Sequence, residues 1–197
     1  MKNNILLSLL TIIFMPFLSS CGYNSLVKKD EGCSSQWAQV ENVYQRRSDL
    51  IPNLVSTVKG VADFEQKTLT AVIEARAQAT KVTIDANNLN EESIQKFQQA
   101  QGSLTSALSR LMVVSEQYPN LKANQNFLEL QSQLEGTENR ITVERQKFND
   151  VVKDYNSTAR SFPTNLMAKM FGFITKGYFK AAEGADKVPT VDFEKKP

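Results

Sequence analysis

The chain is 197 residues long, a length that fits one domain better than two. Its 23 Lys and Arg residues nearly balance 21 Asp and Glu, so the net charge of +2 gives no electrostatic basis for binding nucleic acid. Histidine is absent, which excludes histidine-ligated metals and the serine-histidine and cysteine-histidine forms of catalysis. Only 8 Gly and 6 Pro occur, and this scarcity favours long uninterrupted elements.

The first 20 residues have the pattern of a secretory signal. Lys2 precedes a mostly apolar run from Ile5 to Leu18, which is too short to span a bilayer. The following Leu18-Ser19-Ser20-Cys21 resembles a bacterial lipobox, in which the cysteine receives a diacylglycerol group and the preceding peptide is removed. The alternative is a simple signal peptide whose cleavage site happens to precede a cysteine.

The lipobox predicts that Cys21 is acylated and that acyl chains tether the mature chain to either the inner or the outer membrane, on the extracytoplasmic side. The expected organisation is a signal peptide over 1–20, a helical domain over 21–185 and a charged, extended or disordered tail over 186–197. Cys33 would then be the remaining thiol, so no intrachain disulfide could form. We expect Cys33 to be a small core residue; the other interpretation is a reactive thiol.

Apolar residues in the mature chain recur at intervals of seven. The clearest row is Phe127, Leu134, Ile141, Phe148, Tyr155 and Phe162. This spacing is typical of the seam of a helical bundle, whereas strands would alternate with a period of two. The predicted helices are 24–59, 61–82, 91–117, 121–160 and 164–182. Short connections make neighbouring helices antiparallel, so the expected fold is all-α: an elongated up-and-down bundle of about four long helices plus a short C-terminal helix.

Several residues mark the expected ends of these helices. Asn90 is placed to cap the helix that begins at Glu91, and Pro119-Asn120 forms a stop and restart. Pro163 should end the fourth helix, after which Thr164 or Asn165 can cap the next one.

Pro52 interrupts the first predicted helix. One interpretation is a break, with Ser48 or Asp49 capping a new helix. The other is a continuous, kinked helix, which the unbroken heptad phase from Trp37 to Val58 favours. Asn53 is positioned to satisfy the carbonyl that Pro52 leaves without an N–H donor.

The cluster Arg46, Arg47 and Asp49 is a candidate docking site. Arg47 interrupts an apolar row, so it should point inward and need a partner, because a buried unpaired charge costs several kcal/mol. Candidate partners on the fourth helix are Glu138, Glu144 and Asp150. Two interpretations remain: an ion pair that fixes the bundle register, or a cluster that docks a ligand or a protein together with Asn53.

The C-terminal part is rich in aromatic residues: Phe162, Phe171, Phe173, Tyr178 and Phe179. These residues fit a helix that folds back over one end of the bundle. Alternatively, Phe171 and Phe173 belong to an apolar docking surface for a partner or for the lipid interface. The residues Met167, Lys169, Met170 and Lys176 would suit such an interfacial helix.

No pattern indicates catalysis or a cofactor. The sequence contains no Gly-rich phosphate loop, Gly-x-Ser-x-Gly or Ser-x-x-Lys motif. Without histidine, the carboxylates Glu135, Glu138 and Glu144 do not form a persuasive metal site. We therefore expect no enzymatic activity, no metal and no cofactor.

The string Gln45-Arg46-Arg47-Ser48-Asp49-Leu50-Ile51-Pro52-Asn53-Leu54-Val55 resembles the LemA family. The resemblance returns at Thr137-Glu138-Asn139-Arg140-Ile141 and at Phe171-Gly172-Phe173. It implies a bacterial membrane-anchored helical bundle whose body lies outside the cytoplasm, with no established enzymatic activity. Two features depart from the family pattern: the lipobox, where many members have a transmembrane helix, and Phe64, where a histidine is common before the Glu.

Two functions remain as hypotheses. The first is a non-enzymatic interaction or scaffold module that binds an envelope protein. The second is a small-ligand or lipid-binding protein, with a groove between helices near Arg47 and the Phe171–Phe179 segment. An open apolar groove of several hundred Å³, on the order of known ligand pockets, would favour the second.

Overall fold

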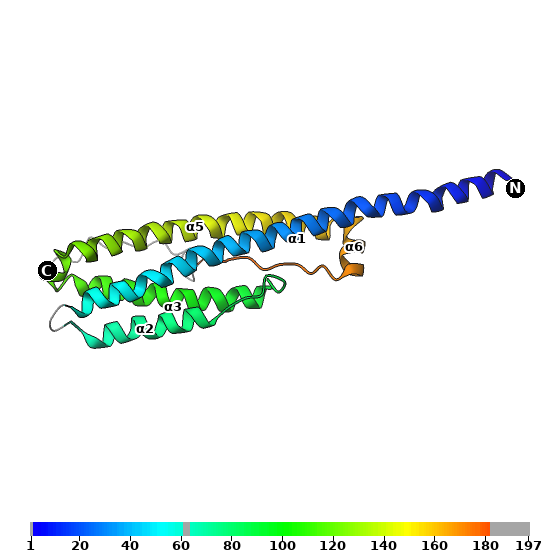
Figure 1. The fold of residues 1–197 in the computed structure, drawn as a ribbon. Coiled ribbons are helices and arrows are strands. Elements are labelled where there is room, and N and C mark those ends of the chain that lie inside the picture. Colours follow the sequence, from blue (N-terminus) through cyan, green and yellow to red (C-terminus); the bar gives the residue numbers. More distant parts are fainter. Residues whose placement is uncertain (1, 61–63, 182–197) are drawn as a thin grey trace, which may run out of the picture.

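The computed structural model describes the backbone of residues 2–60 and 64–181, with side chains from residue 22 onward, and these residues form helices without any strand. Four long helices run side by side along a rod (Figure 1): α1 (Lys2–Lys59), α2 (Gln66–Lys81), α3 (Glu91–Ser115) and α5 (Gln125–Arg160). Two short helices, α4 (Pro119–Lys122) and α6 (Thr164–Phe171), complete the set. Successive long helices run in opposite directions, so the predicted all-α up-and-down bundle is confirmed.

The four long helices form two antiparallel pairs. Helix α1 packs mainly against α5, and α2 packs mainly against α3, with further contacts between α1 and α2. Apolar residues spaced by three and four line each seam. On α5, for example, Phe127, Leu134, Ile141, Phe148 and Tyr155 are buried, as the heptad row predicts. The last member of the row was predicted wrongly: Phe162 lies beyond the end of α5 and is exposed.

Helix α1 passes through Pro52 without a break, which confirms the continuous interpretation. Proline has no N–H, so the carbonyl of Ser48 lacks its helical partner. This carbonyl accepts a hydrogen bond of 2.9 Å from Nε of Arg76 on α2. The role that we expected for Asn53 was therefore assigned wrongly: Asn53 is exposed on α1, and a side chain from a neighbouring helix supplies the donor.

The helix ends agree with the sequence at some positions and differ at others. The Asn90 side chain accepts from the Ser93 N–H at 2.8 Å, so the predicted cap is confirmed. Pro119 begins the single turn of α4, and α5 starts only at Gln125, after Asn124 caps it by accepting from the Phe127 N–H. The start predicted at 121 is therefore four residues too early.

Helix α2 also starts later than predicted. It begins at Gln66 rather than 61, and Glu65 before it has an extended backbone. The cap predicted for α6 is wrong as well, because Pro163 occupies the cap position and no side chain caps the helix.

The predicted helix 164–182 ends at Phe171. Gly172 adopts a φ of 76°, a left-handed conformation that favours glycine and stops a helix. Residues 173–181 form no regular element and run back along the bundle (Figure 1); we call them the strap. The tail predicted for 186–197 lies outside the described residues.

Candidate functional site

Arg47 is buried at the centre of the bundle, with only 2% of its surface exposed. Its Nη1 donates to Oε2 of Glu138 on α5 and to Oγ1 of Thr105 on α3, each at 2.9 Å. Its Nη2 donates to Oε1 of Gln101 at 2.6 Å, and its guanidinium lies 5.0 Å from the centroid of the Tyr44 ring. The expected inward orientation and ion pair with α5 are confirmed.

This polar layer connects the two helix pairs. Gln101 accepts from Arg47 and donates its own Nε2 to the carbonyl of Ala79 on α2, while Arg76 of α2 donates to α1. A chain of hydrogen bonds therefore joins all four long helices. Charged and polar groups that must be paired when buried favour one alignment of the helices, so this layer is suited to fix the register.

The layer also divides the apolar interior in two. One cluster lies toward the N-terminal side of Arg47 on α1 and includes Trp37, Tyr44 and Phe148. The other lies toward the end of α1 and includes Ile51, Leu54 and Phe127. Arg47 lies between Tyr44 and Ile51 in sequence, so the polar layer separates two apolar clusters and does not lie at the surface of a single one.

An open groove lies beside Arg47, with a volume of about 820 Å³. It is lined by polar and charged side chains: Gln99, Ser103 and Ser106 of α3, Glu138 and Arg145 of α5, and Tyr178 and Lys180 of the strap. Most of the lining side chains carry a donor or an acceptor, so the groove can form hydrogen bonds to a polar partner, and their carbon atoms supply apolar contact as well.

The strap forms one end of this groove and is held by carboxamide side chains. Asn149 donates to the Phe179 carbonyl and accepts from its N–H, both at 2.9 Å. In the same way, the Asn156 side chain donates to the Lys176 carbonyl and accepts from its N–H. The Gln98 side chain of α3 forms the same two hydrogen bonds with Lys180. Each carboxamide thereby satisfies both backbone groups of one residue, as a neighbouring strand would.

Close packing of the strap against α3 requires a glycine at 177. The Gly177 N–H donates to the carbonyl of Leu89 at 2.8 Å, and a Cβ at this position would lie 2.7 Å from the Cα of Glu91. Two residues later, Phe179 is buried, with its ring stacked on Trp37 at 6.0 Å and beside Phe148 at 5.5 Å. The strap therefore belongs to the core of the rod.

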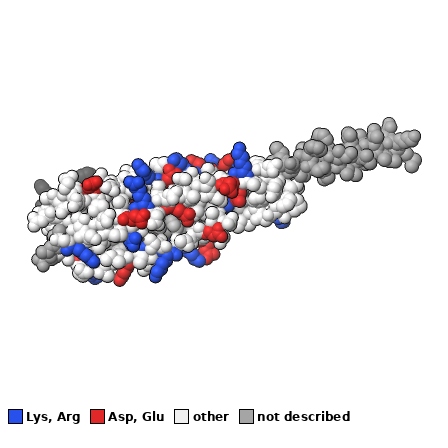
Figure 2. Space-filling model, in the orientation of Figure 1, with Lys and Arg blue, Asp and Glu red and all other residues white. Residues whose placement is uncertain are grey.

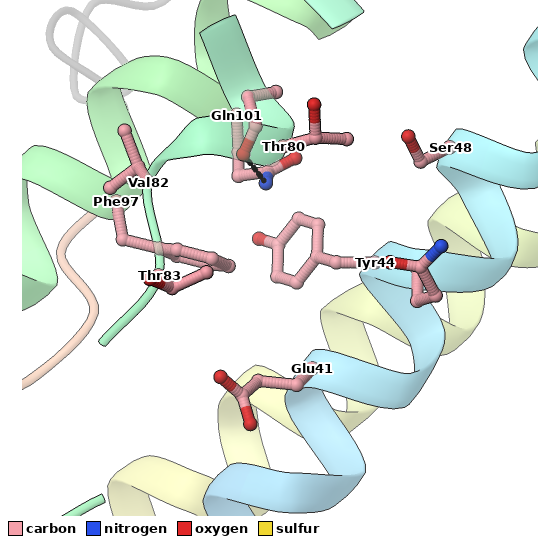
Figure 3. Close-up of a pocket in the computed structure, with 10 residues that line it drawn as sticks. Glu41, Tyr44, Ser48, Thr80, Val82, Thr83, Phe97 and Gln101 are labelled. Atoms are coloured by element: carbon pink, nitrogen blue, oxygen red, sulfur yellow. Dashed lines mark hydrogen bonds between the residues drawn. The ribbon is translucent and has the colours of Figure 1, made fainter. Parts of the chain in front are cut away.

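A smaller cavity, of about 90 Å³, lies on the other side of Tyr44 (Figure 3). Tyr44 points from α1 toward Phe97 and Gln101 of α3, while Glu41 and Ser48 flank it on α1. Burial raises the pKa of Tyr44, so its phenol stays protonated at neutral pH. The space is far below the several hundred Å³ that is usual for organic ligands.

The predicted site residues do not converge. Arg46, Asp49 and Asn53 are exposed on α1, where Gln45 donates to Asp49 at 2.7 Å, while Arg47 alone of this cluster is inside the bundle. Phe171 is exposed and Phe173 is half-buried; both contact Tyr23, at the other end of the rod from Phe127. The groove reaches Tyr178 and Lys180 but neither Phe171 nor Phe173.

The sequence analysis missed two features: the carboxamide side chains that hold the strap, and the role of Arg76 as donor to the Ser48 carbonyl. The sequence does contain a pattern that could have indicated two of the carboxamides. Asn149 and Asn156 are seven residues apart and directly follow the apolar positions Phe148 and Tyr155. Polar residues that keep the heptad beside a seam are candidates for buried contacts.

The pKa shifts of Glu144 and Tyr155 come from hydrogen bonds and burial that stabilise the bundle. Hydrogen bonds from Lys147 and Gln36 lower the pKa of Glu144, which is opposite to what a general acid needs. Burial, aided by the nearby Asp30 carboxylate, raises the pKa of Tyr155 to about 12, and its hydroxyl donates to the Ile174 carbonyl. Within the described part of the chain, no three Cys, Asp or Glu side chains gather to hold a metal ion.

Cys33 is fully buried, and burial raises its pKa from 9.0 to about 11. The thiol ionises in the unfolded chain first, so we expect stability to be independent of this group below pH 9. Between pH 8 and 10.5 the free energy of unfolding should fall by about 2 kcal/mol. Urea unfolding of the wild type and of Cys33→Ala at pH 8 and pH 10.5 measures how much of the fall in the free energy of unfolding is due to Cys33. Other groups titrate in both proteins, so parallel pH profiles would contradict the assignment.

Charges on the visible face of the rod are mixed in sign (Figure 2). Among residues 22–60 and 64–181, no helix combines the length and the apolar character needed to cross a membrane.

The fold and the groove together define an all-α bundle protein with an open groove between its helix pairs. The chain belongs to the LemA family, whose model matches residues 36–193, so the resemblance in the sequence is confirmed.

The relatives are distant in sequence but similar along most of the chain. Protein LemA of Metamycoplasma hominis is 23% identical, over 91% of this chain and 78% of its own length. Magnetosome protein MamQ 2 of Paramagnetospirillum magneticum is 25% identical, over 83% of this chain. Magnetosome protein MamQ of Magnetospirillum gryphiswaldense is 24% identical over the same share. The match spans 66% of the length of each MamQ protein.

Proposed function

We propose that this chain is a LemA-like, lipid-anchored and non-enzymatic protein of the bacterial envelope that acts as an interaction or scaffold module. The observation that carries the proposal is the groove between α3 and α5, which presents hydrogen-bonding side chains without a converging set of reactive groups in the described residues. The lipobox at Cys21 supplies the anchor, and membership of the LemA family supports a place in the envelope.

The partner in this proposal is a polar segment of an envelope protein that binds in the groove. Carboxamides already hold one extended stretch of polypeptide, the strap, at the end of this groove. Farther along α3, Gln99, Ser103 and Ser106 offer further donors and acceptors to an extended backbone. Binding of a small ligand is the second candidate, since the volume of about 820 Å³ fits such a molecule.

A photocrosslinking amino acid at Ser103 tests the partner. Ser103 lines the groove, while Ser109 is also exposed on α3 but lies outside it, so Ser109 is the matched control. In intact cells we expect Ser103, but not Ser109, to give one discrete protein adduct. The second variant is Gly102→Trp, which fills the groove; a Cβ at Gly102 meets no atom within 4 Å, so the helix should tolerate the change.

The adduct from Ser103 should disappear when Gly102→Trp is added. Identical adducts from both positions, or an adduct that persists with the filled groove, would contradict docking there. The anchor is tested separately by radioactive fatty-acid labelling of the wild type and Cys21→Ser. Label should enter the wild type alone, and unchanged incorporation in the variant would refute acylation at Cys21.

A further inference from the structure

A cluster of exposed apolar side chains lies at one end of the rod. It contains more than half of the exposed large apolar residues in the described part of the chain, and Phe162 and Met170 are 81% and 65% exposed. We call it the anchor-end patch; its members are Tyr23, Val27, Phe162, Leu166, Met170, Phe171 and Ile174. The ring centroids of Tyr23 and Phe171 are 4.8 Å apart, so the patch continues from α1 onto α6.

Helix α6 turns apolar residues both inward and outward. Ala168 is buried and Met167 packs against the core, so this side faces the bundle. Leu166 and Met170, four residues apart, share another side of the helix and are exposed. Large apolar side chains that remain exposed together on a monomer mark a surface that contacts something apolar.

The patch lies next to the proposed lipid attachment site. The Thr164 side chain, in the first turn of α6, is 3.8 Å from the position that a Cβ would take at Gly22. Gly22 directly follows Cys21 in the sequence. In Figure 1, α6 lies where α1 leaves the bundle, so acyl chains on Cys21 would bring this end of the rod to the bilayer.

Charge at this end complements an anionic lipid surface. Its acidic groups Asp154 and Asp30 form ion pairs with Lys29 and Lys176, and Glu31 lies one turn beyond Val27. No ion pair among the described residues involves the exposed basic residues on the flanking segments, Lys28, Arg160 and Lys169. Lysine and arginine beside an apolar face are typical of helices that lie in the bilayer interface.

We propose that the anchor-end patch inserts into the interface of the membrane that holds the lipid anchor, with α6 at headgroup level and the rod projecting outward. This inference rests on the proposed acylation of Cys21 and adds a second contact to it. Arg47 follows Gly22 by 25 residues of continuous helix, so the groove would stand roughly 40 Å from the attachment point at 1.5 Å per residue.

Site-specific fluorescence quenching tests the inference on the full chain. The protein is purified from bacterial membranes with Leu166→Cys or Met170→Cys, labelled with the environment-sensitive fluorophore NBD, and reconstituted into phosphatidylethanolamine and phosphatidylglycerol vesicles. Val113→Cys, which is 70% exposed on α3 at the opposite end, is the matched control. We expect spin-labelled lipid to quench the fluorophore at 166 and 170 several-fold more than at 113.

Labelling of the wild-type chain distinguishes the acylation of Cys21 from the insertion of the anchor-end patch. Its buried Cys33 should take no label, and Cys21 takes none if its sulfur is acylated. Equal, weak quenching at all three positions in a wild type that stays unlabelled would overturn the inference while leaving the anchor intact. Labelling of Cys21 in the wild type would refute the anchor and, with it, the inference. Strong quenching at 166 and 170 with no wild-type labelling supports both.

Discussion

Replacing Arg47 with alanine should lower the free energy of unfolding by about 3–5 kcal/mol, because it removes a large buried side chain together with its hydrogen bonds. The guanidinium fills the layer between the two cores and donates to Gln101, Thr105 and Glu138. Alanine would leave these groups without their donor and would leave a cavity beside Tyr44. Urea unfolding followed by circular dichroism measures the loss.

Two matched variants separate the causes. Glu138 is 47% exposed, but its partner Arg47 is buried, so Glu138→Gln, which keeps an acceptor and removes the counter-charge, should cost about 1.5–3 kcal/mol, less than Arg47→Ala. Arg47→Met fills most of the volume but lacks the donors, so it should recover only the part of the loss that comes from the cavity, while Gln101 and Thr105 stay without their donor. If Arg47→Ala destabilised no more than Glu138→Gln, the layer would have no role in holding the helix pairs together.

Phe179→Ala should cost about 3–5 kcal/mol, the range for removing a buried aromatic side chain. Its ring contacts Trp37, Phe97 and Phe148, and it is the most deeply buried apolar side chain of the strap. The emission of Trp37, the single tryptophan, should shift to longer wavelength as water reaches it. Thermal unfolding and tryptophan fluorescence check both effects.

Phe162→Ala is the control for this change. It removes the same side chain from a position that is 81% exposed, so the expected loss is below about 0.5 kcal/mol, as for surface substitutions. Equal destabilisation by the two variants, or an unchanged Trp37 spectrum in Phe179→Ala, would show that the strap is not part of the folded core.

The period of seven was sufficient to predict the long helices and most of their buried faces. Burial follows the rows through Trp37, Leu54, Phe127 and Phe148 because a helix must turn its apolar stripe toward a neighbour. The inward position of Arg47 was predictable for the same reason, since a charge in an apolar row has nowhere else to point. Which of the three candidate carboxylates, Glu138, Glu144 or Asp150, pairs with Arg47 depends on the axial register of α1 and α5. The heptad pattern does not determine this register.

The strap could not be predicted because its backbone is satisfied by distant side chains. Phe173 to Ala181 carries apolar residues at helical spacing, yet Gly172 and Gly177 disfavour a helix, and Asn149, Asn156 and Gln98 supply the hydrogen bonds instead. The partner for the Ser48 carbonyl was missed in the same way. It comes from Arg76, on a different helix, and local sequence favoured the adjacent Asn53.

The pairing of α1 with α5 has a consequence for how the chain is made. During synthesis or export, the apolar stripe of α1 emerges first, but the helix that covers it lies more than 60 residues further along the chain. The strap, which ties α3 to α5, follows later still. Native contacts of such long sequence separation form slowly, because a large loop must close before they stabilise anything. The nascent protein should therefore depend on a chaperone to shield α1, and chains truncated before α5 should aggregate rather than form half a rod.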